Sequence, residues 1–201
     1  EDPEYSITQT PLNEQDLKTM SEAVEVLRQF KGFSHFKEMS DIINRLEDHV
    51  ASARMKTTPV IDFEKNESLK GLDYLDTIYH AIVNEHPIRL KYRSFKARSA
   101  NSFIFYPYLL KEYRNRWFVY GVRKNGRILQ NLALDRIQSL EVLPQEHYIR
   151  NTFFDPNTFF DDLVGVTKNS GSKAEKVGFK VKADEAPYII TKAIHRSQQL
   201  I

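Results

Sequence analysis

The sequence predicts an α+β protein in which helices come first, a small antiparallel β-sheet or barrel follows, and a short α/β segment comes last. Apolar residues recur every three or four positions early in the chain and every second position after Ile88, which are the periods of helices and strands. Residues 1–87 hold 9 Lys and Arg against 17 Asp and Glu, residues 88–136 hold 12 against 2, and residues 137–201 hold 8 against 8. These blocks of −8, +10 and 0 predict two or three units, with an anionic partner for the basic one.

The composition excludes several classes of protein. A hydrophobic content of 41% with 12% aromatic residues is sufficient for folded cores. The absence of cysteine excludes disulfides, thiolate metal sites and a cysteine nucleophile, and it suits a reducing cytoplasm. No apolar run approaches the ~18–20 residues that cross a bilayer, and the first residues do not resemble a signal peptide. We therefore expect a cytoplasmic protein without membrane contact, and the missing initiator Met suggests a fragment.

Two amphipathic helices are predicted within residues 1–55. Asn13 is suited to cap the first helix and Gly32 to end it, and the second helix begins near Ser34. A short connection between them favours an antiparallel helical hairpin, although the same apolar stripes could pack against a second chain. The stripes consist of Leu17, Met20, Val24 and Leu27 in the first helix, and of Phe36, Met39, Ile43, Leu46 and Val50 in the second.

A linker over residues 56–70 leads to a third predicted helix, at about 69–85, which Pro87 stops. Five strands are then expected at 88–92, 103–110, 116–123, 127–134 and 136–143. In the first strand, apolar Ile88, Leu90 and Tyr92 alternate with cationic residues. Pro107 indicates an edge or a bulge in the second. Asn125-Gly126 predicts a hairpin with a type I′ turn between the third and fourth.

The last part of the chain is predicted to be less regular. Residues 151–172 read as a short helix anchored by Phe153, Phe154, Phe159 and Phe160, followed by a flexible linker. A new unit begins at residue 173, with a strand over 176–182 and a helix from about 184 to 191.

Five separated elements of the sequence, taken together, resemble the WYL-domain family of bacterial transcriptional regulators. They are Tyr92, Pro107-Tyr108, Lys111-Glu112-Tyr113, Trp117-Phe118-Val119 and Leu134-Asp135-Arg136-Ile137. The resemblance implies a helical region at 1–55, an Sm-like or SH3-like WYL β-barrel with a leading helix at 71–150, a linker with a short helix at 151–172 and a truncated C-terminal α/β extension at 173–201. It also implies that a DNA-reading helix-turn-helix domain precedes the helical region and is missing here.

The chain departs from the family pattern at four positions. Phe118 and Val119 replace the Tyr and Leu that give the family its name, so a contact needing the tyrosine hydroxyl is lost at 118. Tyr106 stands where related members often have His. Gln130 stands where many have Arg, which removes one expected cation.

The resemblance implies a barrel that senses a nucleotide or single-stranded nucleic acid and relays its binding to the DNA-binding domain, which would contact operator DNA. The local chemistry agrees, because arginines suit phosphate recognition and aromatic rings offer faces on which bases stack. The predicted ligand-binding residues are Tyr92, Arg93, Tyr106, Arg114, Arg116, Trp117, Tyr120, Arg123 and Arg136.

Each of these residues also has a purely structural interpretation. Trp117 could belong to the core, and Arg136 could serve only as the ion-pair partner of Asp135. The basic strand face as a whole could simply be solvated. A second hypothesis is therefore a constitutive interaction module, which assembles a homodimer or contacts the operator backbone without a small ligand.

The sequence predicts no enzyme, metal or cofactor. Its six histidines lack metal-ligand spacing, and its adjacent carboxylate pairs diverge on a helix or strand and make poor acid/base pairs. No glycine-rich phosphate loop, Walker sequence or nucleophile elbow is present.

Overall fold

The structure is a computed structural model. It describes residues 15, 16, 19, 20, 23, 41, 45, 70–152, 154–169 and 171–201, and the chain divides into two compact units, residues 1–77 and 78–201. The predicted helical hairpin lies almost wholly outside the described residues. The seven described residues before 70 are all helical, and the Thr19 hydroxyl donates to the Gln15 carbonyl oxygen at 2.9 Å, as in one turn of a helix.

The helix predicted at 69–85 is present but shorter. A 3-10 turn, η4 (Leu72–Tyr74), leads into α3 (Leu75–Val83). The helix ends before Pro87 because the chain turns back at Glu85, whose φ is 53°. The Glu85 amide donates to the Ile82 carbonyl at 3.2 Å and the His86 amide to the Ala81 carbonyl at 2.8 Å. This pair of bonds is a Schellman motif, so local backbone geometry ends the helix.

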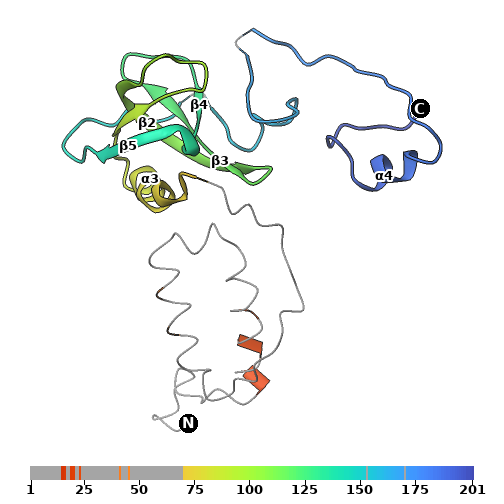
Figure 1. The fold of residues 1–201 in the computed structure, drawn as a ribbon, viewed down its shortest axis with the longest axis horizontal. Coiled ribbons are helices and arrows are strands. Elements are labelled where there is room, and N and C mark those ends of the chain that lie inside the picture. Colours follow the sequence, from red (N-terminus) through yellow and green to blue (C-terminus); the bar gives the residue numbers. More distant parts are fainter. Residues whose placement is uncertain are drawn as a thin grey trace, which may run out of the picture. The chain divides into compact units, whose positions relative to one another are not determined.

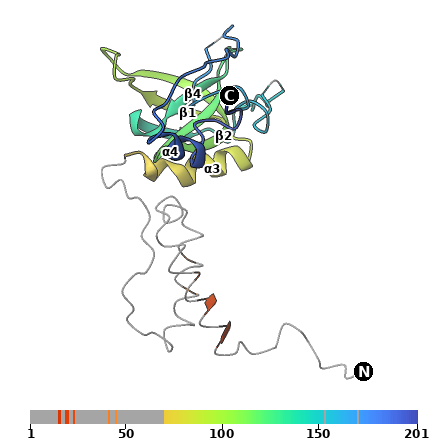
Figure 2. The ribbon, with the colours of Figure 1, turned by 90° about the vertical axis from the view of Figure 1, so that its right-hand side faces the viewer.

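The second unit is built on a five-stranded antiparallel sheet with the order β4-β3-β2-β1-β5 (Figure 1). Its strands are β1 (Ile88–Tyr92), β2 (Asn101–Tyr113), β3 (Arg116–Arg123), β4 (Gln130–Ala133) and β5 (Ile137–Val142). A 3-10 turn, η5 (Leu134–Arg136), joins the two edge strands β4 and β5. The sheet curves strongly in both views (Figures 1 and 2). Helix followed by antiparallel sheet confirms the α+β class.

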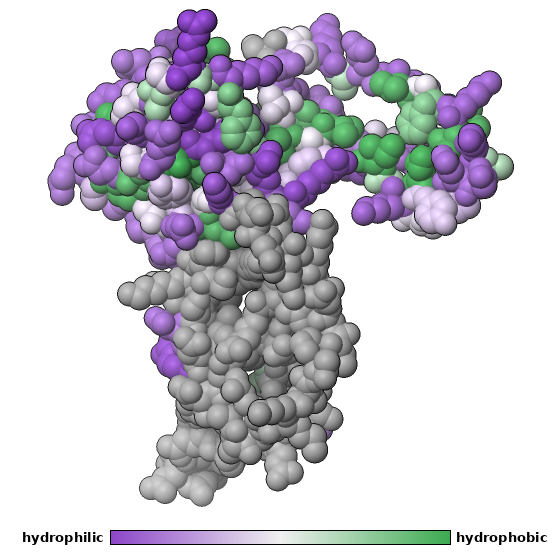
Figure 3. Space-filling model, viewed as in Figure 1, coloured by the Kyte–Doolittle hydropathy of each residue, from purple (hydrophilic) through white to green (hydrophobic). Residues whose placement is uncertain are grey.

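The predicted alternation of buried and exposed residues is present in β1, whereas β3 buries five consecutive residues. In β1, Ile88, Leu90 and Tyr92 are buried while Arg89 and Lys91 are exposed. Strand β3 has the predicted bounds, whereas β4 is half the predicted length. Hydrophilic residues dominate the visible surface of this unit (Figure 3).

Strand β2 is central and carries the bulge that Pro107 predicted. Its register with β3 shifts between Pro107 and Leu109, so the edge position that Pro107 also allowed is not adopted. Gly121 lies opposite Pro107, and a Cβ atom there would come within 2.1 Å of the Tyr106 carbonyl oxygen. Only glycine therefore allows β3 to approach β2 this closely.

The predicted type I′ turn lies in a different hairpin. Arg114 and Asn115, between β2 and β3, have φ values of 50° and 58°. Tyr113 and Arg116 pair on either side of them, so this two-residue loop has the positive φ values that a type I′ turn requires. At Asn125-Gly126 only Asn125 has a positive φ, of 65°, and the Gly126 amide donates to Arg123 across a turn centred one residue earlier. The predicted β3–β4 hairpin is thus confirmed, but the prediction of a type I′ turn within it is wrong.

A segment after the sheet covers one of its faces. We call residues 154–168 the strap. It forms consecutive turns in place of the short helix predicted within 151–172. Its Phe154 stacks on Tyr120 with the ring centroids 5.9 Å apart, and Phe159 and Phe160 meet the same ring edge-on. Anchoring by Phe154, Phe159 and Phe160 is confirmed, and it depends on packing instead of a helix, while Phe153 lies outside the described residues.

The C-terminal segment, residues 171–201, contains a single helix, α4 (Ala186–Thr191), within the range predicted for one. The strand predicted at 176–182 is absent, and Val177 and Phe179 are exposed. A strand needs a partner for its backbone hydrogen bonds, and none of the described residues supplies one.

Candidate ligand-binding site

Four of the nine predicted site residues come together where β1 ends and η5 begins. The Arg93 amide donates to the Arg136 carbonyl oxygen at 3.2 Å, and the Tyr92 hydroxyl accepts a hydrogen bond from the Ala133 amide at 3.3 Å. Arg116, at the start of β3, reaches the same place through its ion pair with Asp135. We call Tyr92, Arg93, Phe95, Arg116, Asp135 and Arg136 the arginine cluster.

Asp135 lies at the centre of the arginine cluster. Its carboxylate is 3.3 Å from the Arg116 Nε and 3.8 Å from the Arg136 Nε, and its side chain is only 12% exposed. Within the described part of the chain, the buried atoms Asp135 Oδ1 and Arg136 Nε each lack a hydrogen-bond partner. Buried polar atoms are nearly always hydrogen-bonded in folded proteins, so this pair is unusual. The predicted ion pair is therefore present, and its two atoms without a hydrogen bond face each other at 3.8 Å.

Tyr92 interacts with the arginine cluster through its hydroxyl group. Burial raises the pKa of its phenol, and the nearby Arg136 guanidinium and the Ala133 amide offset part of that rise. The ring is buried on the core face of β1, and the hydroxyl reaches a polar partner, as a buried tyrosine requires. Tyr92 therefore supports the Arg136 position from inside the sheet.

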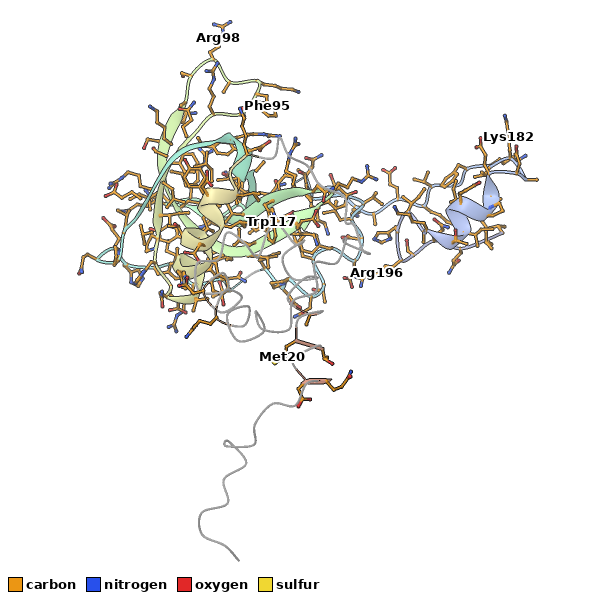
Figure 4. All side chains as sticks on the ribbon, turned by 60° about the horizontal axis from the view of Figure 1, so that its bottom comes forward. Met20, Phe95, Arg98, Trp117, Lys182 and Arg196 are labelled. Atoms are coloured by element: carbon orange, nitrogen blue, oxygen red, sulfur yellow. The ribbon has the colours of Figure 1, made fainter. Side chains whose placement is uncertain are left out.

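The sequence reasoning missed Phe95. It lies on the loop between β1 and β2, which also carries Arg98 (Figure 4). The Arg136 guanidinium carbon lies 4.4 Å from the centre of its ring, in cation–π geometry. The sequence does show an aromatic residue between Arg93 and Lys96. A loop has no periodicity, however, so the sequence pattern could not predict whether the Phe95 ring is buried or exposed.

Trp117 and Arg114 lie next to Arg116 along the chain. Trp117 is partly buried on β3 and pairs in register with Glu112. Arg114 occupies the β2–β3 turn, and its guanidinium stacks over Tyr113 with 5.4 Å to the ring centre. Trp117 follows Arg116 directly and Arg114 precedes it by two residues, but no hydrogen bond or ion pair of the described residues joins either to Asp135 or Arg136.

Tyr106 and Tyr120 are buried, so neither ring is open to a ligand in this structure. Tyr106 packs edge-on against Tyr148, with the ring centroids 6.0 Å apart. Tyr120 is 1% exposed, and its hydroxyl donates to the Val166 carbonyl oxygen of the strap. Burial raises the pKa of the Tyr120 phenol. The period-two pattern could not reveal this, because the strap that covers Tyr120 comes from a distant part of the sequence.

Arg123 makes a separate site at the other end of β3. Its guanidinium carbon is 3.8 Å from the centre of the Phe103 ring, and its Nε donates to the Gln130 side-chain oxygen at 2.9 Å. This contact gives a physical account of Gln130, where family members often have Arg. An amide oxygen accepts the Arg123 hydrogen bond, whereas a second guanidinium would repel it.

The described residues contain no group of three His, Cys, Asp or Glu side chains placed to hold a metal ion. Every helix in the described ranges is too short or too polar to cross a membrane.

Comparisons with known proteins match the chain to a domain family and to several solved structures. The WYL domain family matches residues 73–142. Among solved structures, proteasome accessory factor B/C (PafBC) of Arthrobacter aurescens is similar at 16% identity over 55% of this chain, with a TM-score of 0.36, and the likeness spans 16% of that protein's length. No curated protein matches the chain. The matched range holds the whole five-stranded sheet and every residue of the arginine cluster. The family match identifies residues 73–142 as a WYL domain.

Proposed function

We propose that the chain is the ligand-sensing portion of a DNA-binding transcriptional regulator, and that it binds a nucleotide or a single-stranded nucleic acid at the arginine cluster. DNA-reading residues would lie in another domain of the whole protein. The WYL-domain match over residues 73–142 supports the regulatory role. The observation that carries the ligand site is that Arg116 and Arg136 both pair with Asp135, while Arg93 bonds through its amide to the Arg136 carbonyl.

The chemistry of the arginine cluster suits an anion with several oxygens. Guanidinium groups present planar pairs of donors that match phosphate, and they stay charged at every physiological pH. Asp135 holds Arg116 and Arg136 in place, so part of the entropy of ordering these long side chains is lost before a ligand arrives. The buried Arg136 Nε, which has no described hydrogen-bond partner, is a donor that a phosphate oxygen or a bridging group would satisfy.

Coupling to a DNA-binding domain would require two arrangements of the regulator with different affinities for the ligand. The arginine cluster lies at junctions that could transmit such a change. It joins β1 to the turn between the two edge strands, and Arg93 bonds directly to the backbone of that turn. A homodimer could carry the change further.

The first test uses Trp117, the sole tryptophan of the chain, as a reporter beside Arg116. The protein is titrated with short single-stranded DNA, single-stranded RNA, cyclic dinucleotides and mononucleotides, and fluorescence anisotropy of labelled ligands provides a second readout. A specific site predicts saturable binding with a ranking of ligands that persists between about 50 and 200 mM salt. Binding of none of them at low salt, by either readout, would reject the proposal.

The alternative is an interaction module without a small ligand. One observation favours it, since the three arginines of the cluster already have intramolecular partners in Asp135, Phe95 or the Ala97 carbonyl. Such a module predicts non-specific binding to polyanions, with a steep loss of affinity as salt rises and no ranking among ligands.

A further inference from the structure

Phe95 is the aromatic ring of the arginine cluster that is open to solvent. The residue is 74% exposed, although large aromatic rings are usually packed away from water. Its only described ring contact is with Arg136, whose guanidinium lies 4.4 Å from the ring centre. A ring that touches a guanidinium on one side and is exposed to this degree offers its other face to solvent.

The surroundings of this ring are cationic. Arg93 precedes it by two residues, Lys96 follows it directly and Arg98 lies at the tip of the same loop, and all three are exposed (Figure 4). A flat apolar face between cations matches the pattern of a nucleotide, in which a base adjoins phosphates. An aliphatic ligand or a bare anion would gain nothing from the ring.

From these observations, and resting on the function proposed above, we infer that Phe95 is the base-stacking residue of the site. A nucleobase stacks on the open face of the ring, while Arg136 supports the opposite face and the flanking cations contact the phosphates. The ligand is therefore a nucleic acid or nucleotide bound through its base as well as its backbone, and the site favours ligands with an accessible base over abasic phosphate chains.

The chain contains a second arginine–phenylalanine pair that serves as a comparison. Phe103 contacts the Arg123 guanidinium at 3.8 Å, but its other neighbour is Phe105, at 6.3 Å between ring centroids, and it is partly buried in the sheet. Phe103 lacks an equally open face. A cation–π contact alone does not make a surface on which a base can stack. The same substitution at Phe95 and Phe103 therefore separates the cation–π contact from base stacking.

The experiment measures the affinity of a short oligothymidylate and of an abasic oligonucleotide of equal length, at fixed salt, by anisotropy. Wild-type protein is expected to prefer the oligothymidylate. Phe95→Leu should weaken oligothymidylate binding by about fivefold or more, since stacking contributes about that factor per base or more, and should leave abasic binding unchanged. Phe95→Tyr should restore the preference. Phe103→Leu, with its folding checked by thermal melting, should retain it.

The outcomes separate this inference from the proposed function. If the wild type binds both oligonucleotides equally, or if Phe95→Leu keeps the preference for the oligothymidylate, the stacking role is overturned while the anion site stands. If the wild type binds neither, the proposed function fails, and the stacking role fails with it.

Discussion

At the scale of single residues, the site depends on one carboxylate between two guanidinium groups. Asp135 contacts Arg116 and Arg136 and is mostly buried, which makes it the anionic centre of an otherwise cationic surface. A carboxylate in this place orders the arginines and at the same time repels an anionic ligand. These two effects have opposite consequences for binding, and a substitution can measure which is larger.

Asp135→Asn should tighten the binding of an oligothymidylate by about threefold to tenfold. The substitution removes one negative charge within a few ångströms of the ligand site and keeps the shape of the side chain. Anisotropy at two salt concentrations measures the effect, and Asp184→Asn, an exposed carboxylate in the C-terminal segment, is the matched control. Weaker binding by Asp135→Asn, with the melting temperature unchanged, would show that ordering the arginines is the dominant role.

Gly121 is a residue at which adding a single methyl group should strongly lower the stability of the fold. An alanine Cβ there would meet the Tyr106 carbonyl oxygen at 2.1 Å and the Phe105 ring at 2.7 Å. Gly121→Ala is therefore expected to lower the free energy of unfolding by at least about 2 kcal/mol, through overpacking at the bulge. Urea denaturation provides the measurement. Gly178→Ala, where a Cβ meets nothing within 4 Å, should change it by less than about 0.5 kcal/mol.

At the scale of elements, the strap completes the packing of the sheet. Phe154, Phe159 and Phe160 surround Tyr120. The Asn131 side chain of β4 donates to the Val166 carbonyl and the Thr167 hydroxyl, each at 2.9 Å. The residues matched by the family end at 142, before any of these contacts. A folded unit of this sheet therefore needs residues beyond the matched range.

Phe154→Ala should destabilise the second unit by about 3 to 5 kcal/mol, since it removes a buried ring from the centre of this aromatic group. Phe179→Ala, at a residue 58% exposed in the C-terminal segment, is the control and should be nearly neutral. Chemical denaturation followed by Trp117 fluorescence measures both. Equal stability of the two variants would mean that the strap does not pack on the sheet in solution.

The elements show what a sequence can and cannot predict. Alternation located β1 because that strand buries one set of side chains, and a proline indicated the bulge in β2. Strand β3 has the predicted bounds but buries five consecutive residues. The strand expected at 176–182 did not form, although its pattern is as regular, because pairing depends on a partner that periodicity does not reveal. The sequence predicted the type I′ turn at Asn125-Gly126. The structure instead has the positive φ values of such a turn at Arg114-Asn115, between the paired strands β2 and β3.

The site was predictable in the same uneven way. The charge pattern and the family resemblance predicted Arg93, Arg116 and Arg136 as ligand-binding residues, which stays a prediction. Arg116 and Arg136 both pair with Asp135, and the Arg93 amide bonds to the Arg136 carbonyl. Tyr120 was also selected, but the strap buries it, and Phe95 was overlooked because it lies in a loop. Long-range packing decides which aromatic rings remain open, and the sequence carries little information about that.

At the scale of the whole molecule, the second unit buries several phenol groups. Burial raises the pKa values of Tyr92, Tyr108, Tyr120 and Tyr148 above their ordinary value of 10.0. Because the folded state holds these protons more tightly than the unfolded state, stability is complete below the ordinary value and is lost as the pH rises toward the folded values.

The second unit should therefore unfold cooperatively in alkali, with the phenolate absorbance of these four tyrosines rising together with the loss of the sheet signal in circular dichroism. Titration of these four tyrosines in one reversible step near the ordinary value, with the sheet intact, would contradict the packing described here.

The central claim is that the basic block binds an anionic ligand at one place, the arginine cluster, and the most direct test compares two arginines. Arg136 belongs to the cluster, whereas Arg127 is exposed in the loop between β3 and β4. Replacing either arginine with alanine removes one positive charge. Arg136→Ala is expected to weaken oligothymidylate binding by about tenfold or more, because a charge-assisted hydrogen bond is lost. Arg127→Ala is expected to weaken it by less than about threefold. Equal losses for the two variants would mean that the charge of the whole face, with no defined site, attracts the ligand.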